Sequence, residues 1–241
     1  MGSGPVLVWL HGFTQTRDSA HQFRSILAGT YELLTLDLPG HGENAPISAS
    51  LNETADLLAD VLPAEPFILS GYSMGARVAL HFALRHRERL SALVVLSATA
   101  GIRDEGEREL RRSQDNDLAD RIDLIGAEVF LDEWLARPMF TSLPHDPLER
   151  AARSRDTKGL SNSLRRAGTG TQAWLGDALA SLDVPTLVVA GADDAKFVGE
   201  ARLLRETLPN VAVALVAGAG HAAHLERPDA FAQIVRSAQP Q

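Results

Sequence analysis

The most informative segment of this 241-residue chain reads Phe67-Ile68-Leu69-Ser70-Gly71-Tyr72-Ser73-Met74-Gly75-Ala76-Arg77-Val78-Ala79-Leu80. Its centre fits the pattern Gly-x-Ser-x-Gly, with an apolar run before it and a helical pattern after it. The glycines two residues on either side of Ser73 remove the Cβ atoms that would collide as the chain reverses. We therefore expect a strand, a tight turn and a helix, with Ser73 projecting from the carboxyl edge of a sheet. The competing interpretation is a serine that only caps a helix.

Short apolar runs rich in β-branched residues recur on both sides of this segment and indicate buried strands. They cover residues 6–10, 33–36, 67–70, 93–96, 186–190 and 211–216. Stretches with helical spacing lie between them. Since parallel strands that alternate with helices are covered on both faces, the sequence predicts an α/β fold with a mostly parallel sheet flanked by helices.

The strand pattern is missing from residues 101–166, where charged amphipathic stretches replace it. Such stretches are typical of helices with one face in water, and we expect most of their arginines to be solvated. We interpret 101–166 as a helical cap inserted into an α/β core made of residues 1–100 and 167–241.

Composition and charge exclude several classes of protein. The chain has 23 Lys and Arg against 31 Asp and Glu, a net charge of −8, and no Cys. Disulfides, thiolate metal sites and a cysteine nucleophile are therefore excluded. A nucleic-acid partner is disfavoured, because neutralising phosphates needs a surplus of cations. No apolar run is long enough to cross a bilayer, and the first five residues lack signal-peptide features, so we expect a cytoplasmic protein without membrane insertion.

A serine that acts as nucleophile or base needs a histidine to take its proton and a carboxylate to orient that histidine. In this fold the three follow in the order Ser, Asp, His. Asp193 and Asp194 are adjacent after the run 186–190, and both cannot face one imidazole. His221 and His224 both follow the last run. Position favours His221, because it directly follows a glycine-rich loop at the end of a strand. His224 lies nearer the helix expected to begin around Pro228.

Two backbone N–H groups are candidates for an oxyanion hole. The Met74 N–H lies at the start of the helix after Ser73, where the helix dipole favours negative charge. The Phe13 N–H belongs to the loop after the first strand. His11 in that loop and His41 in the glycine-rich segment 37–42 are expected to brace their loops through hydrogen bonds instead of taking part in catalysis.

These features together resemble the α/β-hydrolase superfamily over essentially the whole chain. A closer resemblance is to the 2-succinyl-6-hydroxy-2,4-cyclohexadiene-1-carboxylate synthases of menaquinone biosynthesis. It rests on Gly71-Tyr72-Ser73-Met74-Gly75-Ala76-Arg77, Asp194-Ala195-Lys196-Phe197, Gly220-His221-Ala222-Ala223-His224-Leu225-Glu226-Arg227-Pro228 and three stretches of the predicted cap. The resemblance selects Asp194 over Asp193 and His221 over His224.

The resemblance also implies a lyase that needs no cofactor and no metal. In such enzymes the activated serine removes a substrate proton and pyruvate is expelled, without an acyl-enzyme. The substrate carries several carboxylates, and Arg77 lies one helical turn after Ser73, so both can border one pocket. By the same resemblance Arg111 and Arg153 of the cap would bind carboxylates.

Tyr72 and Trp134 would line the same pocket. The spacing from Arg153 to the later Leu160 is one residue shorter than in the family, which leaves Arg155 as an alternative ligand.

The leading hypothesis is thus the elimination of pyruvate from 2-succinyl-5-enolpyruvyl-6-hydroxy-3-cyclohexene-1-carboxylate by a monomer or homodimer, with Ser73, Asp194 and His221 abstracting the proton. One alternative is a carboxylic-ester or C–C bond hydrolase that uses Ser73 as a covalent nucleophile. Another is a noncatalytic ligand receptor on the same fold.

Overall fold

The computed structural model describes residues 4–237, so residues 1–3 and 238–241 of the predicted core lie outside the described part. Six strands form one sheet in the order β2-β1-β3-β4-β5-β6. They are β1 (Val6–Leu10), β2 (Glu32–Leu36), β3 (Phe67–Tyr72), β4 (Leu90–Leu96), β5 (Thr186–Gly191) and β6 (Val211–Val216). Every neighbouring pair is parallel, so the carboxyl ends of the strands meet along one edge. The predicted α/β fold is confirmed.

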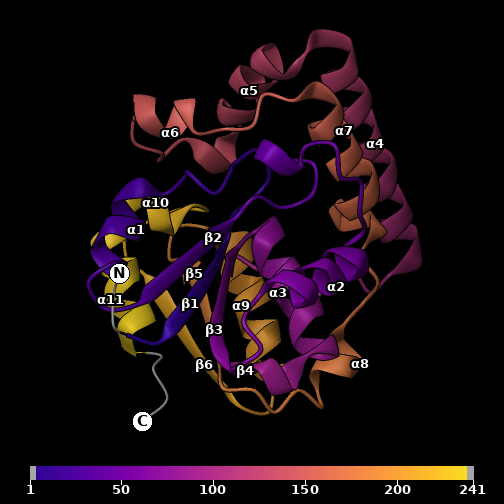
Figure 1. Ribbon diagram of the computed structural model, residues 1–241. Helices are drawn as coiled ribbons and strands as arrows, with labels where there is room; N and C mark the ends of the chain where they lie inside the picture. Colours follow the sequence, from indigo (N-terminus) through magenta and orange to yellow (C-terminus); the bar gives the residue numbers. More distant parts are fainter. Residues whose placement is uncertain (1–3, 238–241) are drawn as a thin grey trace.

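Helices cover both faces of this sheet (Figure 1). Apolar side chains of α2 (Leu51–Val61), α3 (Met74–Arg85), α8 (Gly176–Leu179) and α9 (Ala195–Thr207) form one buried cluster with the strands. Those of α1 (His21–Leu27) and α11 (Pro228–Ser237) form a second cluster on the other face. Strands such as β3 and β5 are buried along their whole length, which explains why their sequences read as continuous apolar runs.

Four helices between β4 and β5 form a separate layer: α4 (Glu105–Ile125), α5 (Ala127–Leu135), α6 (Pro147–Ala151) and α7 (Thr157–Ala167). Figure 1 shows α5 and α6 at the top of the view, with α4 and α7 running down its right-hand side. Of these helices, α4, α5 and α7 share a small core that includes Ile122, Phe130 and Leu160. We call all four the cap helices. The limits of 101 and 166 drawn from the sequence stay a prediction.

Aspartates determine where three cap helices begin. The side chains of Asp104, Asp146 and Asp156 accept hydrogen bonds from backbone N–H groups in the first turns of α4, α6 and α7. These bonds satisfy donors that have no partner inside the helix. Three of the four cap helices therefore begin at a local signal, and the apolar faces of α4, α5 and α7 then pack together.

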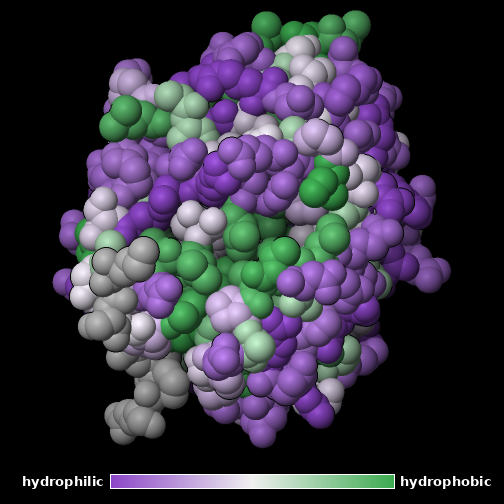
Figure 2. Space-filling view, in the orientation of Figure 1, coloured by the Kyte–Doolittle hydropathy of each residue, from purple (hydrophilic) through white to green (hydrophobic). Residues whose placement is uncertain are grey.

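The surface is mostly hydrophilic, as the charged composition predicts. Figure 2 shows mostly hydrophilic residues on this face, with hydrophobic side chains toward the middle, where the sheet edge at β2 lies. Most of β2 is only half-buried, as expected for an edge strand. Within residues 4–237 no helix is both long enough and apolar enough to cross a membrane.

Candidate active site

Ser73 occupies a strained turn between β3 and α3. Its backbone has φ 51° and ψ −106°, a region that residues with a Cβ rarely adopt. A Cβ at Gly71 would lie 2.5 Å from the backbone of Gly75, and one at Gly75 would lie 2.3 Å from the Leu10 carbonyl oxygen. Only glycine fits at both positions. The Ser73 side chain makes no capping hydrogen bond to α3, so the structure argues against the helix-cap interpretation.

Three side chains from distant parts of the chain meet at this turn. The Nε2 atom of His221 lies 3.3 Å from Ser73 Oγ, and its Nδ1 atom lies 2.8 Å from Asp194 Oδ2. In this chain of hydrogen bonds Nδ1–H donates to the carboxylate and Nε2 accepts the serine proton. Asp193 is exposed and has no side-chain contact with the imidazole. The geometry therefore favours Asp194.

The carboxylate of Asp194 is held in its charged form. Burial by itself raises its pKa, but the hydrogen bond and charge of His221, with the Phe197 N–H and Lys196, lower the pKa below its ordinary value. Its Oδ1 atom accepts from the Phe197 N–H at 3.3 Å, so the same residue orients His221 and begins α9. The Phe197 ring packs against the imidazole, with centroids 4.5 Å apart.

Two further residues hold the His221 backbone, and the sequence analysis missed both. The Ser97 hydroxyl donates to the His221 carbonyl at 2.8 Å. The buried Glu226 carboxylate accepts from the N–H groups on either side of the histidine, Gly220 at 2.6 Å and Ala222 at 3.0 Å. Glu226 lies in the segment 220–228, which carries part of the resemblance to the family. That resemblance is the only signal in the sequence that points to it.

Two other buried histidines, His11 and His41, serve structure. His11 accepts the Leu38 N–H at Nε2 and donates to the Gly12 carbonyl from Nδ1. His41 accepts the Thr14 N–H and donates to the Pro39 carbonyl. Burial lowers the pKa of His11 to about 4 and that of His41 to about 3, so both are neutral braces.

His224 does not line the cavity that holds Ser73. It is fully buried, its Nε2 atom is 3.3 Å from the Gln15 side-chain nitrogen, and its ring packs on Tyr72 with centroids 4.3 Å apart. Burial lowers its pKa well below 6.5. Among the described residues its Nδ1 atom has no hydrogen-bond partner.

The two candidate oxyanion donors are both available. Phe13 and Met74 line one cavity with Ser73. Within residues 4–237 neither of their N–H groups donates to another protein group. The neighbouring Gly12 N–H donates to Gln15 Oε1 at 2.9 Å, which fixes the loop that carries Phe13.

The cavity at Ser73 has a volume of about 660 Å³ and runs between the sheet edge and the cap helices. Arg77, Arg111, Tyr72 and Trp134 all line it. Arg77 is buried and donates to the Ala167 and Gly168 carbonyls at 2.9 and 3.3 Å. Burial lowers the pKa of Arg77 to about 10, a loss that Asp115 partly offsets, so its guanidinium is charged at neutral pH.

The cap side of this cavity carries further polar groups. Arg111 pairs with the buried Asp115 at 2.8 Å. Arg137 and Lys196 also line the cavity and were not expected from the sequence. The Arg137 guanidinium lies 4.7 Å from the centre of the Trp134 ring, a contact that needs the folded chain to be recognised. The indole N–H of Trp134 has no hydrogen-bond partner among the described residues.

Arg153 faces a different space. It is buried and lines a second cavity, which holds neither Ser73 nor Arg77. Arg155 is half-exposed and pairs with Glu128 at the surface. Burial thus favours Arg153 over Arg155 as a ligand-binding residue, while its role toward the substrate stays a prediction.

One group in the described part of the chain has the ligand atoms of a metal site: His21, Asp146 and Glu149. These side chains already form hydrogen bonds within the protein. The His21 ring and backbone donate to Glu149, and Asp146 accepts from the first turn of α6. We interpret the group as a polar link between α1 and the cap helices.

Comparison with known proteins places the chain in a family. The Alpha/beta hydrolase family matches residues 7–234. A Bacillus subtilis (strain 168) protein provisionally named 2-succinyl-6-hydroxy-2,4-cyclohexadiene-1-carboxylate synthase is 38% identical, over 95% of this chain and 88% of its own. The synthase of that name from Serratia proteamaculans (strain 568) is 31% identical over 97% of this chain and 92% of its own.

The solved structure of MenH from S. aureus superposes with a TM-score of 0.92 and 32% identity, covering 99% of this chain and 94% of that one. A thermophilic esterase from Thermogutta terrifontis shares the fold, with a TM-score of 0.79 and 24% identity over 100% of this chain and 92% of that one. The chain therefore belongs to the alpha/beta hydrolase family and, within it, to the 2-succinyl-6-hydroxy-2,4-cyclohexadiene-1-carboxylate synthases.

Proposed function

We propose that this protein eliminates pyruvate from 2-succinyl-5-enolpyruvyl-6-hydroxy-3-cyclohexene-1-carboxylate to give 2-succinyl-6-hydroxy-2,4-cyclohexadiene-1-carboxylate. Family membership supports this reaction. The observation that carries it is the buried, charged Arg77 in the same cavity as Ser73. A cation beside the reactive hydroxyl suits a substrate with several carboxylates, whereas a neutral ester has no use for it.

The proton transfers follow from the hydrogen-bond chain. Ser73 passes its proton to His221 Nε2 as its oxygen takes the proton from the ring carbon that bears the succinyl group. Asp194 stabilises the resulting imidazolium. The N–H groups of Phe13 and Met74 stabilise the negative charge that develops on the neighbouring ketone oxygen.

The electrons then move around the ring. The broken C–H bond supplies a new ring double bond, the existing double bond shifts by one position, and the C–O bond to the enolpyruvyl group breaks. The leaving enolate takes the proton from His221 and becomes pyruvate. No bond forms between Ser73 and the substrate, and Ser73 ends the reaction with the proton that it took from the ring carbon.

The cap helices have a role in this proposal. Residues 101–166 act as a cap that brings Arg111 and Trp134 over the ring and shields the site from water. Tyr72 forms the opposite wall. The substrate carboxylates meet Arg77 and Arg111, each of which can form a two-pronged pair.

The same three side chains would also serve a hydrolase, so the two reactions are distinguished by which substrate the protein turns over. We expect wild-type protein to release pyruvate from the substrate above far faster than it cleaves aryl esters, and Ser73→Ala to abolish that release. Pyruvate is measured by coupling to lactate dehydrogenase. Rapid ester cleavage without pyruvate would overturn the lyase and leave a serine hydrolase; tight ligand binding without any turnover would indicate a receptor.

A further inference from the structure

Ser97, the residue directly after β4, has a backbone conformation that favours glycine. Its φ is 52°, in the left-handed region, where a Cβ atom crowds the backbone. Within residues 4–237 three other residues that carry a Cβ have a positive φ, among them Thr14 beside Phe13 and Ser73 itself. Strained backbone persists only where the surrounding structure enforces it, and it concentrates at functional sites. The strain at Ser97 therefore points to a role in the site.

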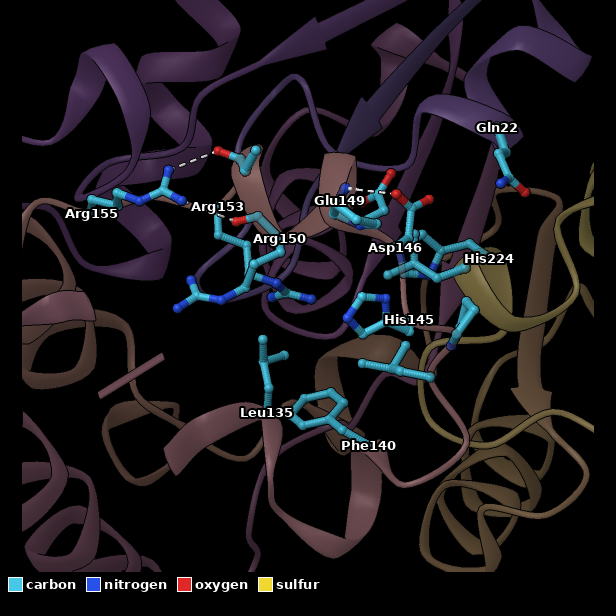
Figure 3. Close-up of a pocket in the computed structure, with 15 residues that line it drawn as sticks. Gln22, Leu135, Phe140, His145, Asp146, Glu149, Arg150, Arg153, Arg155 and His224 are labelled. Carbon is cyan, nitrogen blue, oxygen red and sulfur yellow. Dashed lines mark hydrogen bonds between the residues drawn. The ribbon is translucent and has the colours of Figure 1, made fainter. Parts of the chain in front are cut away.

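The end of β4 holds both partners of the proposed proton transfer. The Leu96 carbonyl accepts a hydrogen bond from the Ser73 N–H at 2.9 Å. The next residue, Ser97, donates its hydroxyl to the His221 carbonyl at 2.8 Å. Two consecutive residues thus hold the backbones of the serine and the histidine whose Oγ and Nε2 atoms lie 3.3 Å apart. Ser97 also lines the cavity at Ser73 and not the second cavity, whose lining is drawn in Figure 3.

The sheet fixes the position of Ser97 itself. Its N–H donates to the Val189 carbonyl of β5 at 2.9 Å, which continues the ladder between β4 and β5. Ser97 and His221 are each 2% exposed, so bulk water has little access to the bond between them. A buried carbonyl that loses its donor costs the protein free energy. The bond therefore ties the histidine to the strand that also holds Ser73.

We propose that Ser97 is a positioning residue: by holding the His221 carbonyl, its hydroxyl sets the distance between the imidazole and Ser73. Glycine would relieve the strained φ but has no hydroxyl to offer the histidine. Glu226 holds the N–H groups on either side of His221, so the two residues together fix the histidine backbone through different groups. The reaction that this arrangement serves rests on the proposed function, whereas the placement of the imidazole does not.

Two variants separate positioning from stability, because both remove the hydroxyl and only one removes the Cβ. Ser97→Ala and Ser97→Gly should each lower kcat for pyruvate release by about tenfold with little change in KM. Ser97→Gly should nevertheless unfold at a higher urea concentration than Ser97→Ala, since alanine keeps the strain at a positive φ.

Ser70→Ala is the matched control. The Ser70 hydroxyl is buried in β3 and has no hydrogen-bond partner among the described residues. The same loss of a buried hydroxyl, three residues before Ser73, should therefore leave kcat at the wild-type value.

A second measurement needs no turnover. In protein with isotope-labelled histidine, NMR follows the exchange with water of the His221 Nδ1 proton, which is donated to Asp194. This proton should exchange faster in both Ser97 variants than in wild type or Ser70→Ala, because the histidine segment is held less firmly.

Wild-type kcat in both Ser97 variants would overturn the proposal. So would a kcat that follows stability, high in Ser97→Gly and low in Ser97→Ala, because that pattern marks a purely structural residue. Unchanged proton exchange in both variants would also contradict it. Failure of the proposed function has a different signature, since wild-type protein would then form no pyruvate while the faster proton exchange in the two Ser97 variants persisted.

Discussion

Replacing Arg77 by methionine tests the proposed reaction most directly. Two of the five guanidinium N–H groups are used by the Ala167 and Gly168 carbonyls, at 2.9 and 3.3 Å from Nη1. The Nε and Nη2 atoms have no hydrogen-bond partner within residues 4–237. These two atoms form the edge of a guanidinium that binds a carboxylate in two-pronged fashion.

The expected loss can be estimated from this geometry. A hydrogen bond to a charged group contributes about 1.5–3 kcal/mol, which corresponds to a roughly 10- to 150-fold lower kcat/KM for pyruvate release. Arg77→Lys keeps the charge but not the two-pronged geometry and should recover part of the loss. Arg85→Met is the matched control, because Arg85 lies on the same helix but pairs with Asp56 at the surface.

The assay is initial-rate pyruvate release at several substrate concentrations, with urea unfolding to confirm that each variant is folded. Methionine also removes the two bonds to the end of α7, so a modest loss of stability is expected alongside the kinetic effect. A kcat/KM of Arg77→Met within twofold of wild type would refute the assignment of Arg77 as a carboxylate ligand. So would an equal loss in Arg77→Lys and Arg77→Met.

Three other predictions concern the histidines and their surroundings. His221→Ala should lower kcat by roughly 10³-fold or more, whereas His224→Ala should cost far less in pyruvate release, and the reverse ranking would contradict the proposed proton path. Glu226→Gln should lower kcat by up to about 100-fold with little change in KM, because an amide offers one accepting oxygen where the carboxylate offers two to the N–H groups beside His221; steady-state kinetics showing a change in KM alone would argue against positioning. Burial, reinforced by His11, lowers the pKa of His41 from 6.5 to about 3. Between these two values the histidine is protonated in the unfolded chain and neutral in the folded chain. The free energy of unfolding in urea should therefore fall as the pH drops from 6.5 toward 3, and His41→Asn should flatten that slope, a result that an unchanged slope would contradict.

Much of the fold is visible in the sequence because its signals are local. The runs at 6–10 and 211–216 became strands with those bounds, and the other strands differ by a few residues at their ends. The Ser73 turn was predictable for the same reason, since the glycines that allow it are two residues away. The parallel order of the strands then brings Ser73, Asp194 and His221 to one edge.

The local sequence pattern could not choose between neighbouring candidate residues of the same type. Asp193 and Asp194 differ only in the direction that the loop gives each side chain, and residue types alone left both open. The resemblance to a family selected Asp194, and the hydrogen bond of 2.8 Å to His221 agrees with it. Arg153 and Arg155 were likewise separable only by burial.

The remaining features exist only in the folded chain, because they depend on the conformation of turns and helix ends and on how separate segments pack. The stacking of Arg137 on Trp134 depends on how α5 ends, and the clamp of Glu226 depends on the turn after β6. The division of space into two cavities depends on Phe140 and Tyr72, which come from the cap helices' layer and from β3. Residue order determined the strands, the turn at Ser73 and the set of reactive groups, whereas long-range packing decided which cation faces which cavity, since burial and distance arise only when separate segments meet.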